Sequence, residues 1–181
     1  MFRKTLAAIA VLAIMAPVMS HAMDMNGKYG LGYFNSSAPV GARYWFSKSA
    51  GVDIGLGFES TDLGSQKANN FWAEAGFPYV ILNKDRANFM IRPGVVFGSL
   101  DARPYGINST KKWTKVNISL MPVAEIFLTD NFSLEAGHGL EVEMISYPTD
   151  AAFDALSGES RTNFRSLAAS ATQIGFHFYF K

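Results

Sequence analysis

The residues of this sequence that could do chemistry are few, and they gather in one short stretch. His138 is followed by Glu141 and Glu143, two carboxylates on alternate positions. Paired carboxylates can act as general acid and base, and a histidine can activate a hydroxyl group. Two acids on alternate positions are also common on one face of a β-strand, so we predict no catalysis by this pair. The chain has no cysteine and three histidines, and it predicts no metal site and no cofactor.

The first 22 residues have the pattern of an export signal. A positively charged start is followed by an apolar run over residues 6–18 and by the small residues Ser20 and Ala22. The run is too short to cross a bilayer as a helix. We therefore predict a cleaved signal peptide over residues 1–22 and a single domain over residues 23–181.

The rest of the chain alternates with a period of two. Hydrophobic residues make up 49% and charged residues 17%, and the formal net charge is +1. This balance predicts neither a disordered chain nor a nucleic-acid-binding protein. Ile54, Leu56 and Phe58 alternate with glycine or acidic residues, whereas a helix would need apolar residues three and four positions apart. Eight runs of this kind predict strands over residues 27–34, 40–46, 51–59, 70–82, 88–99, 113–128, 131–146 and 165–180.

The connections between these runs alternate in length. Short turns are expected at residues 47–50, 83–87 and 129–130, and long polar loops at 60–69, 100–112 and 147–164, with residues 35–39 short where a long loop is expected. Short turns at one end and long loops at the other are typical of antiparallel outer-membrane barrels. The longest loop is the best place for a partner to bind, although no motif in it names a ligand. Because proline cannot donate to a sheet ladder, we expect bulges or strand ends at Pro78, Pro93 and Pro122.

All charges within the eight runs fall on one face of the strands. The other face carries no lysine, arginine, aspartate or glutamate. An eight-stranded barrel is just wide enough for side chains to fill it. We therefore predict a barrel-interior charge network that plugs the barrel, with a narrow ion or solute channel as the alternative. The predicted members are Lys28, Arg43, Asp53, Glu74, Arg92, Lys115, Glu125, Glu135, Glu141 and Glu143, with Glu59 and Arg165 on the same face.

The alternation alone fits either a soluble β-sandwich or a membrane barrel, because both bury one face of each strand. Three features favour the membrane: the export signal, aromatic residues near the strand ends, and the length of the last three runs, roughly 16 residues each. We therefore predict an all-β fold, an eight-stranded antiparallel up-and-down transmembrane β-barrel with both termini in the periplasm.

In these features the sequence resembles the small eight-stranded outer-membrane barrels of Gram-negative bacteria, which include the membrane domain of outer-membrane protein A and the opacity-type barrels. Its last strand matches the assembly signal that the barrel-assembly machinery reads in that family, although Lys181 follows the final aromatic residue. The matching residues are Ile174, Phe176, Phe178 and Phe180. The resemblance implies an outer-membrane location, contact with outer-membrane lipids and lipopolysaccharide, and a structural or surface-interaction role through the extracellular loops.

An enzyme is the alternative interpretation. The alternation places His138 on the outward face, and outer-membrane lipid A deacylases place a His–Ser pair on their lipid-facing side. In those enzymes the serine follows two residues after the histidine, whereas here that position is Leu140, and no outward carboxylate is available to orient the ring. The next strand offers the small outward residues Ser166, Ala168, Ser170 and Thr172. We predict no enzymatic activity and keep a lipid A-modifying hydrolase as the alternative.

Overall fold

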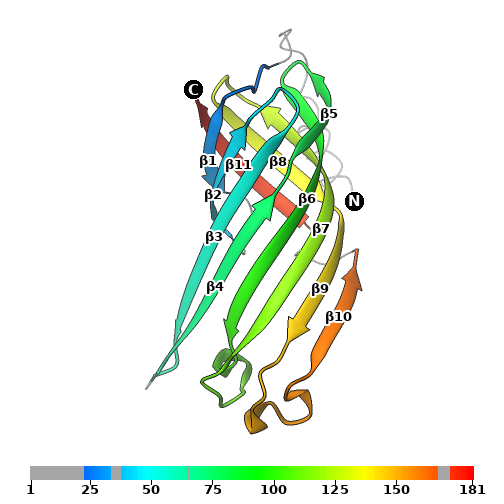
Figure 1. Ribbon diagram of the computed structural model, residues 1–181. Helices are drawn as coiled ribbons and strands as arrows, with labels where there is room; N and C mark the ends of the chain where they lie inside the picture. The colour runs from blue at the N-terminus through cyan, green and yellow to red at the C-terminus, as the bar shows by residue number, and fades with distance from the viewer. Residues whose placement is uncertain (1–22, 34–37, 65, 167–171) are drawn as a thin grey trace, which may run out of the picture.

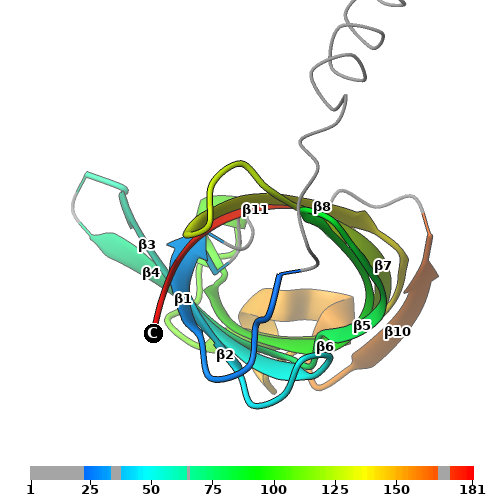
Figure 2. The same ribbon diagram turned by 90° about the horizontal axis from the view of Figure 1, so that it is seen from above.

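In the computed structural model the chain forms a closed antiparallel β-barrel of eight strands (Figures 1 and 2). The structure describes residues 23–33, 38–64, 66–166 and 172–181, so the predicted signal peptide lies outside the described residues. Five barrel strands are single segments: β1 (Tyr29–Tyr33), β2 (Val40–Trp45), β3 (Gly51–Asp62), β6 (Ala87–Asp101) and β7 (Lys112–Phe127). Three are built from two segments each: β4 (Lys67–Gly76) with β5 (Tyr79–Lys84), β8 (Phe132–His138) with β9 (Leu140–Ser146), and β10 (Ser160–Arg165) with β11 (Thr172–Phe180).

Pairing of the first and last strands closes the barrel. Tyr29 on β1 lies opposite Phe180 on β11, and each remaining strand pairs with its neighbour in sequence. The eight predicted runs correspond to the eight barrel strands in order, so the predicted eight-stranded antiparallel barrel is confirmed. The turns β2–β3, β5–β6 and β7–β8 gather at the end that carries the C-terminus, called the turn end below, and the longer connections gather at the opposite loop end (Figure 1).

Two loops predicted as long are shorter, because strands continue into polar sequence. β3 and β4 form a hairpin that projects at the loop end and closes with a turn in which the Leu63 amide donates to the Gln66 carbonyl. Asp62 faces Lys67 across this hairpin. Residues 160–164 likewise pair with β9, which leaves residues 147–159 as the connection. Polarity in these segments marks where the strands leave the apolar surface of the barrel and does not mark where they end.

The loop end carries two short 3-10 helices, η1 (Arg103–Tyr105) and η2 (Ala151–Leu156). Among the described residues, no helix is long and apolar enough to cross a membrane.

The expected strand end is confirmed at Pro78, but the expectation of a bulge or strand end is wrong at Pro93 and Pro122, which lie within the continuous strands β6 and β7. Pro78 separates β4 from β5. The adjacent Phe77 amide donates to the Pro93 carbonyl, and Pro93 donates no bond back because it has no N–H. Pro122 pairs with Ile91 on β6 and on its other side faces the gap between β8 and β9. β6 and β7 therefore run unbroken through their prolines, because the interruption falls in the neighbouring strand.

The two faces of the barrel wall differ sharply. Along β3, Asp53 and Gly55 are buried, whereas Ile54 is 60% and Leu56 57% exposed. Exposed large apolar side chains of this kind occur on all eight barrel strands and form what we call the apolar belt. Its members include Leu31, Val40, Ile54, Leu56, Phe71, Phe97, Ile118, Leu134, Ile174, Phe176 and Phe178. Inside the barrel, a hydrophobic cluster that includes Trp45, Met90, Phe127 and Tyr179 packs together.

Candidate functional site

Arg43 on β2 is the centre of the buried charges. Its Nε and Nη2 donate to the two carboxylate oxygens of Asp53 at 2.6 and 2.9 Å, and its Nη1 donates to Glu135 Oε2 at 2.7 Å. The same Nη1 lies 3.6 Å from Glu125 Oε1. All four side chains are fully buried, so this guanidinium holds three carboxylates that water does not reach.

Arg92 on β6 extends the network across the barrel. Its Nε donates to Asp53 Oδ2 and its Nη2 to Glu74 Oε1, both at 2.6 Å. Asp53 is therefore shared by two arginines that come from strands on either side of it. The guanidinium lies over Gly76, where a Cβ would collide with it, so the glycine makes room for the ion pair.

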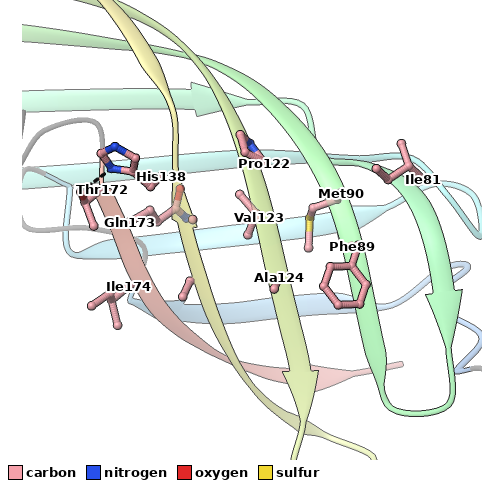
Figure 3. A pocket seen from close by; sticks show the side chains of 12 residues that line it. Ile81, Phe89, Met90, Pro122, Val123, Ala124, His138, Thr172, Gln173 and Ile174 are labelled. Carbon is pink, nitrogen blue, oxygen red and sulfur yellow. Dashed lines mark hydrogen bonds between the residues drawn. The ribbon is translucent and has the colours of Figure 1, made fainter. Parts of the chain in front are cut away.

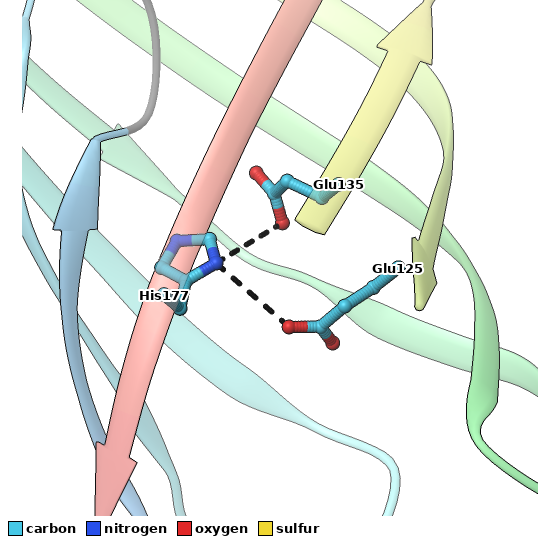
Figure 4. Close-up of side chains that lie close together, drawn as sticks. All are labelled: Glu125, Glu135 and His177. Carbon is cyan, nitrogen blue, oxygen red and sulfur yellow. Dashed lines mark ion pairs between the residues drawn. The ribbon is translucent and has the colours of Figure 1, made fainter. Parts of the chain in front are cut away.

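Glu125, Glu135 and His177 lie together in the same region (Figure 4). His177 Nδ1 is 3.8 Å from Glu125 Oε1 and 3.7 Å from Glu135 Oε2. A histidine and two carboxylates could in principle hold a metal ion. Here Arg43 already supplies positive charge to both carboxylates, and Ser133 and Tyr179 each donate a hydroxyl to Glu125 Oε1 at 2.7 Å. This arrangement fits an ion-pair network better than a metal centre.

A second group of buried charges forms around Glu143 on β9. Its carboxylate pairs with Lys115 and Arg165 and accepts a hydrogen bond from Asn163 Nδ2 at 3.1 Å. Glu141, two residues earlier on the same strand, is also buried. The two glutamates thus point inward as the alternation predicted.

The structure places nine of the ten predicted network residues inside the barrel and leaves Lys28 apart. Lys28 is half-buried at the turn end and donates its Nζ to the Asp130 carbonyl at 3.3 Å. The prediction that Lys28 belongs to the interior network is wrong, because Lys28 stands before the first residue of β1 and its ammonium bonds a turn at the barrel end. Sequence reasoning missed the uncharged partners Ser133, Gln173 and Tyr179, whose inward phase was the available signal.

On the outer wall, His138 lies at the end of β8 opposite Thr172 on β11. Its Nδ1 is 2.8 Å from Thr172 Oγ1, and its Nε2 is 2.7 Å from the Ser166 carbonyl oxygen. Because a carbonyl only accepts, Nε2 carries a proton, and in the neutral ring Nδ1 accepts the Thr172 hydroxyl. The predicted outward position of His138 is confirmed, and its hydroxyl partner comes from the next strand. Ala168 and Ser170 of the expected small-residue row lie outside the described residues.

The pair stands at the edge of a shallow apolar hollow in the barrel wall, with a volume of about 550 Å³ (Figure 3). Its lining includes the small outward residues Pro122, Ala124 and Ala136 and the larger Phe89 and Ile174. Three buried residues also line it: Met90, Val123 and Gln173. The four residues of the predicted assembly signal also face outward on β11.

Asp101 and Arg103 form the best-defined charge pair at the loop end. The Asp101 carboxylate accepts hydrogen bonds from Arg103 Nε, Nη2 and backbone amide, and these lower the pKa of the carboxyl to about 2. The stabilisation is complete above the ordinary pKa of about 3.9 and is lost as the pH falls through about 2.

We expect the amide signal of Gly106, which closes η1, to titrate in NMR with a midpoint near that low value. Asp101→Asn should abolish the transition. A midpoint at the ordinary aspartate pKa would show that the pair does not hold η1.

Comparisons with known proteins leave the family open. No family model matches the chain, and no curated protein matches its sequence. Among solved structures, the N-terminal β-barrel domain of Pseudomonas aeruginosa OprF is similar, with a TM-score of 0.45 and 13% identity over 86% of this chain and 98% of that one. Similarity this low does not transfer a function, so the proposals below depend on the residues of this chain.

Proposed function

We propose that this protein is an integral outer-membrane β-barrel with a filled interior, acting as a structural or surface-interaction protein through its loop end. The observation that carries the proposal is the apolar belt on the outside of a closed barrel whose charges lie inside. Monomeric soluble proteins rarely expose contiguous apolar patches beyond a few hundred Å². A closed barrel also satisfies its backbone within the sheet, which a lipid environment requires.

The absence of cysteine from the chain allows a direct test of this environment. Ile54→Cys places one thiol in the apolar belt, and Asp62→Cys places one on the projecting hairpin. After bimane labelling and folding into phosphatidylcholine vesicles, nitroxide-labelled acyl chains should quench the first probe and leave the second bright. Equal quenching, or a monodisperse protein in buffer without detergent, would contradict the proposal and favour an exported soluble barrel.

The loop end and the last strand supply the proposed contacts. In the outer membrane the belt would contact lipids and lipopolysaccharide, and the outward aromatic residues of β11 are where the barrel-assembly machinery would bind. Exposed Lys111 and Lys112 stand beside Trp113, which stacks on Tyr147 at 5.7 Å, so cationic and aromatic groups occur together at the loop end.

A filled interior predicts little ion flow. Arg43, Arg92 and their carboxylates occupy the cross-section of an eight-stranded barrel, which leaves no wide water path. We expect conductance near background when the folded protein is added to planar lipid bilayers. Steady single-channel steps that disappear with unfolded protein would instead support the channel alternative.

A lipid hydrolase centred on His138 is the second candidate, because a hydroxyl lies 2.8 Å from the imidazole. Two features weigh against it: Thr172 is a secondary alcohol, and a backbone carbonyl orients the ring where a carboxylate would better stabilise its protonated form. We expect the lipid A mass spectrum to be identical in cells with the protein, without it, and with His138→Ala. Loss of an acyl chain that depends on His138 and Thr172 would overturn this expectation.

A further inference from the structure

The hollow in the outer wall is a local break in the apolar belt. Two rows of outward residues cross it: Phe89, Ala124, Ala136 and Ile174 lie in one row by strand register, and the next row toward the loop end contains Pro122, His138 and Thr172. Alanine and proline replace the larger side chains found elsewhere on the belt, and they form the floor of the hollow. Figure 3 shows Phe89 and Ile174 on opposite sides of Ala124.

The depth of the polar pair follows from strand geometry. Thr172 lies eight residues before Phe180, the last residue of β11. With a rise of about 3.4 Å per residue and a tilt of about 40°, it stands roughly 20 Å from the turn end along the barrel axis. The apolar band of a membrane barrel is about 25 Å tall. The pair therefore lies near the loop-side boundary of the band, and the apolar floor extends from it toward the turn end.

The hydrogen bonds within the His138–Thr172 pair leave one hydrogen-bond acceptor available to a ligand. His138 uses Nε2 on the Ser166 carbonyl and Nδ1 on Thr172, so both ring nitrogens are engaged. The Thr172 hydroxyl donates a hydrogen bond to Nδ1 of the neutral ring, and its oxygen still has an acceptor lone pair. Thr172 is exposed on the outer wall, where a ligand can approach its hydroxyl group. A ligand there would offer a hydrogen-bond donor at the boundary and an apolar chain below it.

We propose that the hollow binds one acyl chain of an outer-leaflet lipid whose head end carries an amide N–H or hydroxyl donor, and that Thr172 accepts this donor while His138 fixes the threonine hydroxyl. The proposal rests on the proposed membrane location. It follows from the complementarity of the hollow to such a chain: the floor is apolar, and the polar lining residues Thr172, His138 and Gln173 lie together at the boundary end. His138 acts as a positioning residue in this site, and no bond of the lipid is broken.

The few histidines of the chain give a selective readout. The described residues contain only His138 and His177, the first at the hollow and the second inside the barrel. The ¹⁵N-histidine-labelled protein, folded in dodecylphosphocholine micelles and assigned with His138→Gln, is titrated with N-tetradecanoylethanolamine or with methyl tetradecanoate. The amide donates a hydrogen bond and the ester does not. We expect a saturable shift of the His138 ring signals and about fivefold weaker binding of the ester than of the amide. The His177 ring signals should not shift.

Three variants separate this site from general detergent effects. Ala136→Phe fills the hollow and should abolish the His138 shift, whereas Ala75→Phe, at an outward alanine of β4 outside the hollow, should preserve it. Thr172→Val keeps the shape and should make the two amphiphiles bind equally. An unchanged titration in Ala136→Phe, or no preference for the amide in the unmodified chain, would overturn the proposal. Because each variant is also checked for heat-modifiable migration, failure of the site is distinguished from failure of the barrel to insert.

Discussion

Replacing Arg92 by leucine is expected to destabilise the folded barrel by about 3–5 kcal/mol, the cost of breaking a buried ion pair by removing one partner. Arg92 pairs with Glu74 and shares Asp53 with Arg43, and the side chains of Arg92, Glu74 and Asp53 are all buried. The loss of stability is measured from the change in the urea concentration that half-unfolds the protein in lipid vesicles. Lys67→Leu, at an exposed residue of the projecting hairpin, should change it by less than about 0.5 kcal/mol.

A double-mutant cycle shows whether charge or packing causes the loss. Glu74→Leu combined with Arg92→Leu removes both members of the pair that is 2.6 Å apart. The double variant should lose less stability than the sum of the two single variants, with a coupling of about 0.5–3 kcal/mol. Additive losses would mean that the two side chains do not act as a pair. A stable Arg92→Leu that conducts ions would show that the interior charges line a water path.

The in–out alternation of each strand could be predicted from the sequence, and this alternation shows which residues point inward. The Arg43–Asp53 pair also follows from sequence once the turn at residues 47–50 is recognised, because that turn fixes their register on β2 and β3. The second contact of Asp53, to Arg92, could not be predicted. It spans the intervening β4 and depends on the curvature of the closed wall and on the missing side chain at Gly76.

The outer site shows the same division. Alternation placed His138 and Thr172 on the outward face, but their contact depends on how β8 and β11 align past the interruptions next to them. Pro122 signalled one of these interruptions in the sequence. The hollow itself arises from Ala124 and Ala136, which come from different strands and become neighbours only through register. The alternation within each strand therefore predicts which residues face inward and outward. Which residues become neighbours in a site depends on the register between strands.

The proposed membrane location of the barrel can be tested by introducing an arginine at different depths of the outer wall. Leu56 is 57% exposed and lies five residues along β3 from Gly51, roughly 13 Å up the barrel axis and near the middle of an apolar band about 25 Å tall. In water, Leu56→Arg would add a solvated charge at an exposed position and change stability by less than about 0.5 kcal/mol. In a bilayer the same substitution costs about 2–4 kcal/mol.

Two further substitutions turn this difference into a depth profile. Val52 is exposed one residue from the turn end of β3, and Leu63 is exposed at the tip of the projecting hairpin. We expect Val52→Arg to cost about 0–1 kcal/mol and Leu63→Arg almost nothing, with unfolding by urea measured in the same vesicles. The cost should therefore peak at Leu56 and fall in both directions, because only the bilayer centre excludes water from the guanidinium. A flat profile across the three positions would place this face in water, and the apolar belt would then need a protein partner to cover it.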